Sequence, residues 1–271
     1  MFISLLVSGC TAVTSAAFAQ AAPPPVANQA AAATTPADGD DARARFAKVF
    51  SRRSITNPKM LLAPTASFDI KGNPAPIGTG VGLNLGASFA VMDELLVDAT
   101  IVPAVFAPAA KYNNPLVGAT YRIINGQFEL GAQAQLSLPF DGSFFMRAGV
   151  PVRYHLTDMS RIDAAAYLTV TAKPGTVGMQ IPLQYSHNIT EEIYVGARTG
   201  FIIGDFSAAS ATMAIPLGIV GAYTIPASTG GPLLDVGPSF TFDTFFTPGG
   251  AKAVTPDFWT LSLAGTFYLG L

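Results

Sequence analysis

Hydrophobic and polar residues alternate strictly along residues 127–138. After the dipeptide Asn125-Gly126, every second side chain from Phe128 to Leu138 is apolar, and the positions between them, from Gln127 to Ser137, are polar or glycine. A period of two predicts a β-strand with one apolar and one polar face. Other segments alternate in the same way between clusters of Gly, Pro, Asn and Asp. The twelve predicted strands are 60–70, 77–91, 95–103, 114–124, 127–138, 143–155, 161–171, 177–187, 193–203, 212–224, 233–243 and 258–270.

The length and number of these strands suit a barrel that crosses a membrane. A tilted strand needs about 9 to 11 residues to cross a bilayer, and single-chain outer-membrane barrels have even strand numbers. The links at 92–94, 125–126, 156–160, 188–192 and 225–232 are shorter on average than those that alternate with them. Short turns face the periplasm in such barrels, so both ends of the barrel segment are expected on the periplasmic side.

Composition supports an apolar outer face. Charged residues make up 12% of the chain, against about 25% in ordinary soluble domains. In the last predicted strand, Trp259, Leu261, Leu263 and Phe267 share one face. The mean hydropathy is positive, yet no uninterrupted apolar run is long enough for a membrane helix. A secreted β-sandwich is the alternative fold, but its outward faces would carry more charge than these strands supply.

From residue 60 to 271 the sequence resembles a porin-like bacterial outer-membrane β-barrel. Leu271 stands where that class usually has an aromatic residue. The resemblance implies an all-β fold, a transmembrane antiparallel up-and-down barrel of about twelve strands in the outer membrane of a Gram-negative bacterium. It also implies outer-membrane lipid and the barrel assembly machinery as partners. Six prolines inside predicted strands do not fit a closed barrel, because each removes a ladder donor: Pro64, Pro103, Pro151, Pro182, Pro216 and Pro238.

The first 59 residues divide into three parts. Residues 1–19 are predicted to be a signal peptide cleaved after Ala19, although a lipoprotein box that ends at Cys10 is an alternative. An Ala/Pro-rich linker follows at 20–41. Residues 42–53 are basic, and Phe46, Val49 and Phe50 have the spacing of a short amphipathic helix. This basic segment is expected to be solvated, to lie on an anionic bilayer, or to fold into a lumen.

Charged residues on the polar faces are expected to line the lumen. A two-residue type I′ turn at Asn125-Gly126 would place Arg122 opposite Glu129. Continued pairing would place Gln135 opposite Arg147, Glu129 opposite Arg153, Arg153 opposite Asp163, and His155 opposite Arg161. We call Arg122, Glu129, Arg153 and Asp163 the charge ladder; its role is either to brace the wall or to filter solutes. The other charges predicted to face inward are Asp69, Asp98, Arg198 and Asp235.

Catalytic and metal-binding patterns are weak. The two histidines are His155, expected in the lumen beside arginines that disfavour its protonated form, and His187, expected on the lipid side. Some twelve-stranded outer-membrane barrels are lipases that use a serine and a histidine. Neither histidine here has a serine at an interpretable spacing. The sequence therefore predicts no enzyme, no cofactor and no metal site. Trp259 and Tyr268 are expected in the interfacial aromatic belt.

The function predicted from these features is a narrow passive channel for small polar solutes. Twelve strands enclose a smaller bore than the wide porins. The alternative is a non-conducting structural or ligand-binding barrel that the charge ladder and the N-terminal segment seal. The net charge of −2 excludes a strongly basic nucleic-acid binder.

Overall fold

The computed structural model describes residues 42–73, 78–107, 110–139, 144–173, 175–208, 213–228, 230–247 and 258–271. The predicted signal peptide at 1–19 and the linker at 20–41 lie outside the described residues. No helix in the described ranges is both long and apolar enough to cross a membrane.

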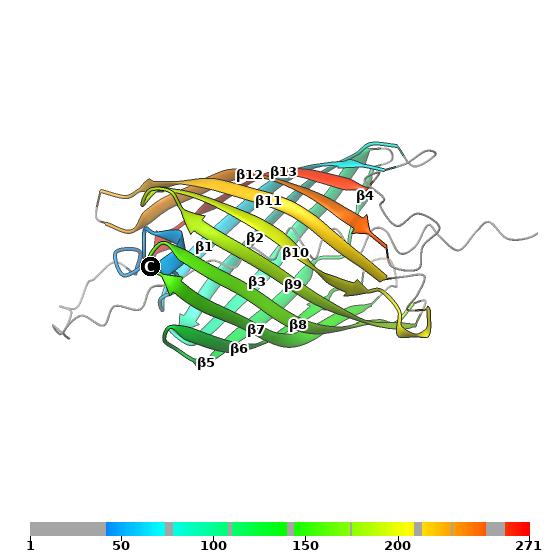
Figure 1. Ribbon diagram of the computed structural model, residues 1–271, viewed down its shortest axis with the longest axis horizontal. Coiled ribbons are helices and arrows are strands. Elements are labelled where there is room, and N and C mark those ends of the chain that lie inside the picture. The colour runs from blue at the N-terminus through cyan, green and yellow to red at the C-terminus, as the bar shows by residue number, and fades with distance from the viewer. Residues whose placement is uncertain are drawn as a thin grey trace, which may run out of the picture.

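Twelve long antiparallel strands form a closed barrel (Figure 1). The last long strand closes the barrel by pairing with the first, from Thr65 opposite Thr266 to Gly72 opposite Trp259. The predicted strands are confirmed, with ends shifted by a few residues at most. The strands are β1 (Leu61–Gly72), β2 (Gly80–Met92), β3 (Leu95–Ala107), β4 (Lys111–Tyr112), β5 (Leu116–Ile124), β6 (Phe128–Ser137), β7 (Phe145–Thr157), β8 (Ser160–Thr171), β9 (Thr176–Asn188), β10 (Ile193–Ile203), β11 (Met213–Pro226), β12 (Pro232–Phe246), β13 (Trp259–Phe267) and β14 (Leu269–Gly270).

The two faces of the wall differ as the alternation predicts. Large apolar side chains such as Leu136, Leu168 and Leu263 are exposed on the outside. Their neighbours Gln135, Thr169 and Ser262 are buried on the inside. A barrel in lipid can expose apolar side chains outward because its solvent there is hydrocarbon, and its closed ladder leaves no backbone group unpaired at an edge.

The prolines occupy interruptions of the hydrogen-bond ladder. Pro151, for example, has a register partner on β8, whereas the β6–β7 pairing skips its position between Leu130↔Val152 and Gln133↔Gly149. The missing proline N–H therefore faces a flank where no ladder bond is required. Pro64, Pro103, Pro182 and Pro238 also have a register partner on one flank only, and Pro216 lies at a register shift.

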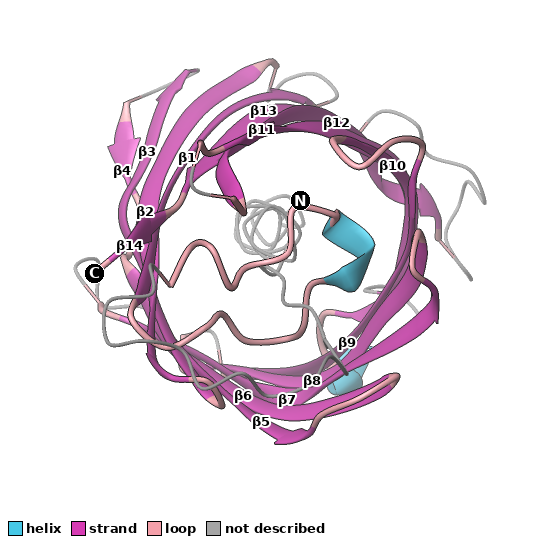
Figure 2. Ribbon diagram, turned by 90° about the vertical axis from the view of Figure 1, so that its left-hand side faces the viewer, coloured by secondary structure: helices cyan, strands magenta, loops and turns pink. Residues whose placement is uncertain are grey.

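Residues 42–60, which precede β1, lie inside one end of the barrel (Figure 2). This end, which we call the turn end, carries the links at 93–94, 125–127, 158–159, 189–192 and 227–231; the opposite end is the loop end. We call residues 42–59 the plug. The plug contains one short 3-10 helix, η1 (Phe50–Arg52), and no strand. The predicted amphipathic helix is thus wrong in its form, because the apolar side chains of the plug pack against several separate elements of the wall.

Candidate functional site

A cavity of about 630 Å³ occupies the lumen of the barrel. It extends from Lys71, Lys111 and Lys173 near the loop end to Phe50 and Ile55 of the plug. Its wall is mixed in sign, because Asp69 and Asp98 line it together with Arg147 and Arg198. The cavity and the plug that forms its floor are the candidate functional site.

A connected polar network lines one side of the cavity. Arg147 donates from Nη2 to Gln135 Oε1 at 2.5 Å, and Gln135 donates in turn to Asp98 at 3.3 Å. The guanidinium of Arg147 lies 4.5 Å from the ring centre of Tyr167, a cation–π contact. Tyr167 covers Gly149, where a Cβ would meet its ring at 2.5 Å. The network places a buried cation beside the solute-sized space.

Arg198 is the second cation of this wall. It is buried on β10 and donates from Nε to Gln184 Oε1 on β9 at 2.6 Å. The register places Gln184 opposite both Arg198 and Asp163, so the polar row continues from the charge ladder across β9 into β10. A solute in the cavity would therefore meet Arg147 and Arg198 from neighbouring parts of the same wall.

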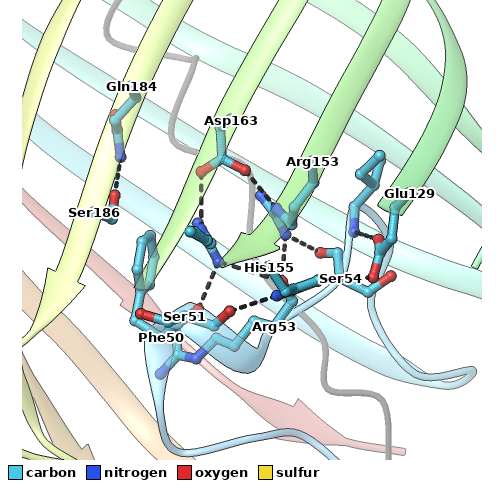
Figure 3. Close-up of polar contacts among 12 residues, drawn as sticks. Phe50, Ser51, Arg53, Ser54, Glu129, Arg153, His155, Asp163, Gln184 and Ser186 are labelled. Atoms are coloured by element: carbon cyan, nitrogen blue, oxygen red, sulfur yellow. Dashed lines mark hydrogen bonds and ion pairs between the residues drawn. The ribbon is translucent and has the colours of Figure 1, made fainter. Parts of the chain in front are cut away.

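The part of the wall nearest the turn end binds the plug through Arg153, Arg161 and Asp163. Figure 3 shows Arg153 and Asp163 beside the plug. Asp163 accepts hydrogen bonds from Nε of both arginines. Their Nη1 groups point the other way and donate to plug carbonyls: Arg153 to those of Arg53 and Ser54, and Arg161 to those of Phe50 and Arg53. The register pairs predicted here are confirmed, namely Glu129↔Arg153, Arg153↔Asp163, His155↔Arg161 and, further along the strands, Gln135↔Arg147.

The predicted pairing of Arg122 with Glu129 is wrong. Arg122 lies opposite Gly131, because the turn pairs Ile124 with Leu130 rather than with Gln127, and the register shift between Arg122 and Ile124 recovers one of these three positions. A type I′ turn needs positive φ at both central residues, and only Gly126 has it; Asn125 does not. Arg122 still faces inward, where it donates to Ser54 Oγ of the plug at 2.6 Å.

Glu129 and His155 also bind the plug. The fully buried carboxylate of Glu129 accepts from the Ile55 N–H at 2.7 Å. His155 lies between two acceptors, with Nδ1 2.7 Å from the Ser51 carbonyl and Nε2 3.2 Å from Glu129 Oε1. The two ring nitrogens of His155 therefore face oxygen atoms of both the plug and the wall.

Arg53 joins the plug to several elements of the barrel wall. Its fully buried guanidinium forms a two-pronged ion pair with Asp235 of β12, and Nη2 donates to Thr224 Oγ1 of β11 at 3.1 Å. The Tyr268 hydroxyl donates to the same carboxylate at 2.8 Å. The prediction that Tyr268 belongs to the aromatic belt is wrong, because it follows the outward Phe267 and points into the lumen with 2% of its surface exposed.

Apolar contacts hold the same segment. Phe50 stacks on Tyr194 of β10 with ring centres 3.7 Å apart, and Phe46 packs against Tyr268 at 4.9 Å. The guanidinium of Arg161 lies 3.7 Å from the centre of the Phe50 ring. Fully burying an aromatic side chain contributes roughly 1.5–3 kcal/mol, so the plug has a small apolar core shared with the wall.

A ring of half-buried to exposed ion pairs joins the plug to the turns; we call it the rim. Lys48 pairs with Glu192 at 2.6 Å and with Glu191 at 2.9 Å, and Arg52 pairs with Asp158 at 2.9 Å. Arg45 approaches Asp93 at 3.9 Å. The hydrogen bond with Glu192 raises the pKa of Lys48 above 10.5, and the same bond lowers the pKa of Glu192 below 4.5.

A Ser–His contact lies on the outer face, where no such pair was expected from sequence. Ser160 Oγ is 2.7 Å from His187 Nδ1, and the Tyr185 hydroxyl is 3.5 Å from the same serine oxygen. His187 is exposed on the lipid side as predicted, but Ser160 is 7% exposed. Among the described residues no acid is bonded to His187. Within those residues there is also no cluster of three His, Cys, Asp or Glu side chains that could hold a metal ion.

Solved structures with the same architecture are outer-membrane channels. An outer-membrane channel from Pseudomonas putida F1 has 11% sequence identity and a TM-score of 0.57, covering 78% of this chain and 96% of the other. The fold is that of a porin-like barrel. The NanC porin matches with 9% identity and a TM-score of 0.55 over 74% of this chain and 98% of that chain. The KdgM porin, solved in complex with disordered oligogalacturonate, has 9% identity and a TM-score of 0.52 over 76% of this chain and 98% of its own. No protein-family model and no curated protein matches the sequence.

Sequence reasoning missed the plug residues that bind the wall. Ser51 and Arg53 were part of the basic segment 42–53 with three possible locations, and only the buried location agrees with the structure. Ile55 lies just after that segment and was given no role. The arginine and phenylalanine side chains of that segment were the available signal for burial in the lumen, because arginine pairs with buried carboxylates and phenylalanine packs on aromatic rings.

Proposed function

We propose that this protein is a narrow passive channel for small polar solutes in the outer membrane of a Gram-negative bacterium. The observation that carries the proposal is the cavity of about 630 Å³ inside a closed barrel, with buried polar side chains around it. A solute can exchange part of its hydration shell for Gln135, Arg147, Tyr167 and Arg198 on the wall.

The turn end is proposed to face the periplasm. Short turns occupy that side in bacterial barrels of this architecture. The plug lies inside this same end. The fold shared with the NanC and KdgM porins supports a channel rather than an enzyme. We propose no catalytic role for Ser160 and His187, because the serine is almost fully covered.

The plug favours a second candidate function, a barrel that does not conduct. The ion pair of Arg53 with Asp235 and the stacking of Phe50 on Tyr194 close the turn end with buried contacts. In that case the cavity would open at the loop end alone and would bind a solute without passing it.

Single-channel recording in planar bilayers separates the two functions. The variant to be recorded combines two substitutions. Cys10→Ser removes the single cysteine of the sequence, and Ser262→Cys adds a thiol on the lumen wall. A bulky thiol reagent should reduce the current of Ser262→Cys. The matched control Leu263→Cys, on the lipid side with 55% of its surface exposed, should keep its current. Absence of current in every form would refute the channel, and equal block of both variants would show that ions bypass the lumen.

A further inference from the structure

We propose that the plug is a displaceable gate, which leaves the turn end as one unit that pivots at Met60 while the barrel stays closed. The inference rests on the proposed channel function. It assigns residues 42–59 to control of the pore rather than to the permanent wall.

The plug can leave without breaking the sheet. No residue from 42 to 60 belongs to a strand, so none of the ladder bonds that close the barrel involves the plug. The wall holds the plug through side chains, chiefly those of Glu129, Arg153, Arg161, Asn188 and Asp235. Rotating or hydrating a side chain is a much smaller change than opening a β-ladder.

The wall charges keep partners of their own after the plug has left. Asp163 remains bonded to Arg153 and Arg161. Asp235 keeps the hydroxyls of Thr224 and Tyr268. Water that enters the vacated space hydrates the groups that had bound plug carbonyls. Asp163 thus keeps its two cations, whereas Asp235 loses its cation and keeps two hydroxyl donors, with water taking the place of Arg53.

The attachment of the plug is graded from the rim to the interior. The rim pairs are more exposed than the interior contacts: the side chains of Arg52 and Asp158 have relative exposures of 46% and 78%, and those of Lys48 and Glu192 have 27% and 30%. Exposed pairs contribute little each and are screened by salt. The interior contacts of Arg53 and Phe50 are fully or almost fully buried. Loss of the rim pairs removes the outer attachment first and leaves the plug held at its centre.

The pivot is a strained and anchored residue. Met60 has φ +67°, the only positive φ of a non-glycine among the described residues. Its N–H donates to Ala90 O at 2.8 Å, and its carbonyl accepts from the Leu271 N–H at 3.0 Å. Strained backbone persists only where the surroundings hold it, and it concentrates at switch regions. Met60 thus stays fixed to the wall while the residues before it change direction.

The effect on the pore follows from the floor of the cavity. Phe50 and Ile55 of the plug line the cavity on its turn-end side. When the plug is in place, these two side chains stand between the cavity and the turn end. When the plug leaves, the cavity gains an opening at the turn end.

A reversible cross-link tests the gate. Ser51 Oγ lies 2.7 Å from Asn188 Oδ1, so cysteines at these positions would face each other. The variant Ser51→Cys with Asn188→Cys, in the Cys10→Ser background, is recorded in planar bilayers before and after reduction. Ser239→Cys with Ser262→Cys is the control, because it joins two neighbouring lumenal positions of the wall that are already in register. Heat-modified electrophoretic migration verifies that each form is folded.

The oxidised plug cross-link should stay in the low-conductance state. After reduction, it should open about tenfold more often than the parent, because the two hydrogen bonds to Asn188 are gone. The wall cross-link should record the same currents in both redox states. Equal currents from oxidised and reduced plug cross-link would overturn the gate and leave the channel standing. Absence of current from the parent and from every reduced form would overturn the channel function and the gate with it.

Discussion

Replacing Arg53 by alanine should detach the plug far more than any change at the rim. The guanidinium is fully buried and bonded to Asp235, Thr224 and two plug carbonyls. Removing one partner of a buried pair typically costs about 3–5 kcal/mol, because the other charge stays buried and unpaired. At about 1.4 kcal/mol per factor of ten, a loss of 3 kcal/mol raises the detached population roughly 100-fold.

Amide hydrogen exchange measures this population directly, because it reports local opening without global unfolding. The N–H groups of Ser51 and Ile55 are bonded to Asn188 and Glu129 of the wall. In Arg53→Ala, exchange at these two amides should accelerate about 100-fold, whereas amides within the strands should not change. The matched control Arg52→Ala loses only an exposed pair and should accelerate exchange by less than about fivefold.

If the amides of Ser51 and Ile55 exchange at the same rate in Arg53→Ala as in Arg52→Ala, the buried guanidinium is not what holds the plug. A double variant adds a second check. Arg53→Met with Asp235→Asn removes the charge on both sides, so it should exchange more slowly than Arg53→Met alone. If the effects of the two substitutions on the free energy of plug opening simply add, the ion pair is not what holds the plug.

Three further predictions concern the rim, the wall and the floor. Because the pKa of Lys48 is raised, its stabilisation of the attached plug is present below pH 10.5 and is lost as the pH rises through its folded pKa. Because the pKa of Glu192 is lowered, its stabilisation of the attached plug is present above pH 4.5 and is lost as the pH falls through its folded pKa. Openings should therefore increase at both extremes in bilayer recordings, and a flat profile would contradict this. Gly149→Ala places a Cβ 2.1 Å from a backbone oxygen and should lower the heat-unfolding temperature, whereas Gly221→Ala, with 3.4 Å of clearance, should not. Glu129→Ala leaves the Ile55 amide without its acceptor and should cost about 1–3 kcal/mol, detected as heat-modified migration at a lower temperature; unchanged migration would exclude that role.

The strands could be predicted because their pattern is local. Lipid on one side and a polar lumen on the other constrain every second residue, so Phe128 to Leu138 carry the assignment without knowledge of any neighbour. The parity also placed Glu129, Arg153 and Asp163 on the inner face. The positions of the prolines could not be explained in the same way, because the gaps in the ladder appear only when both flanks of each strand are known.

Register and plug depend on more than local pattern. The turn displaces Ile124 by three positions along β6, and the register shift between Arg122 and Ile124 takes back one. The net displacement of two positions leaves the Arg122 side chain inside, so the alternation contains no trace of it. The plug is held by partners distant in sequence, for example Ser51 by Asn188, which is 137 residues away. Composition predicted that the segment is basic and partly apolar; only the closed barrel determines which wall groups it meets.

These long separations also set the order in which the molecule is built. Arg53 is synthesised 182 residues before Asp235 and 215 residues before Tyr268. The binding surface of the plug combines β6, β7, β8, β9, β11, β12 and Tyr268, and it is complete only in the closed barrel. We therefore expect residues 42–59 to dock after the barrel closes, and a chain whose barrel has not closed should expose this basic segment. Resistance of residues 42–59 to proteases should therefore distinguish molecules with a closed barrel from molecules whose barrel is still open.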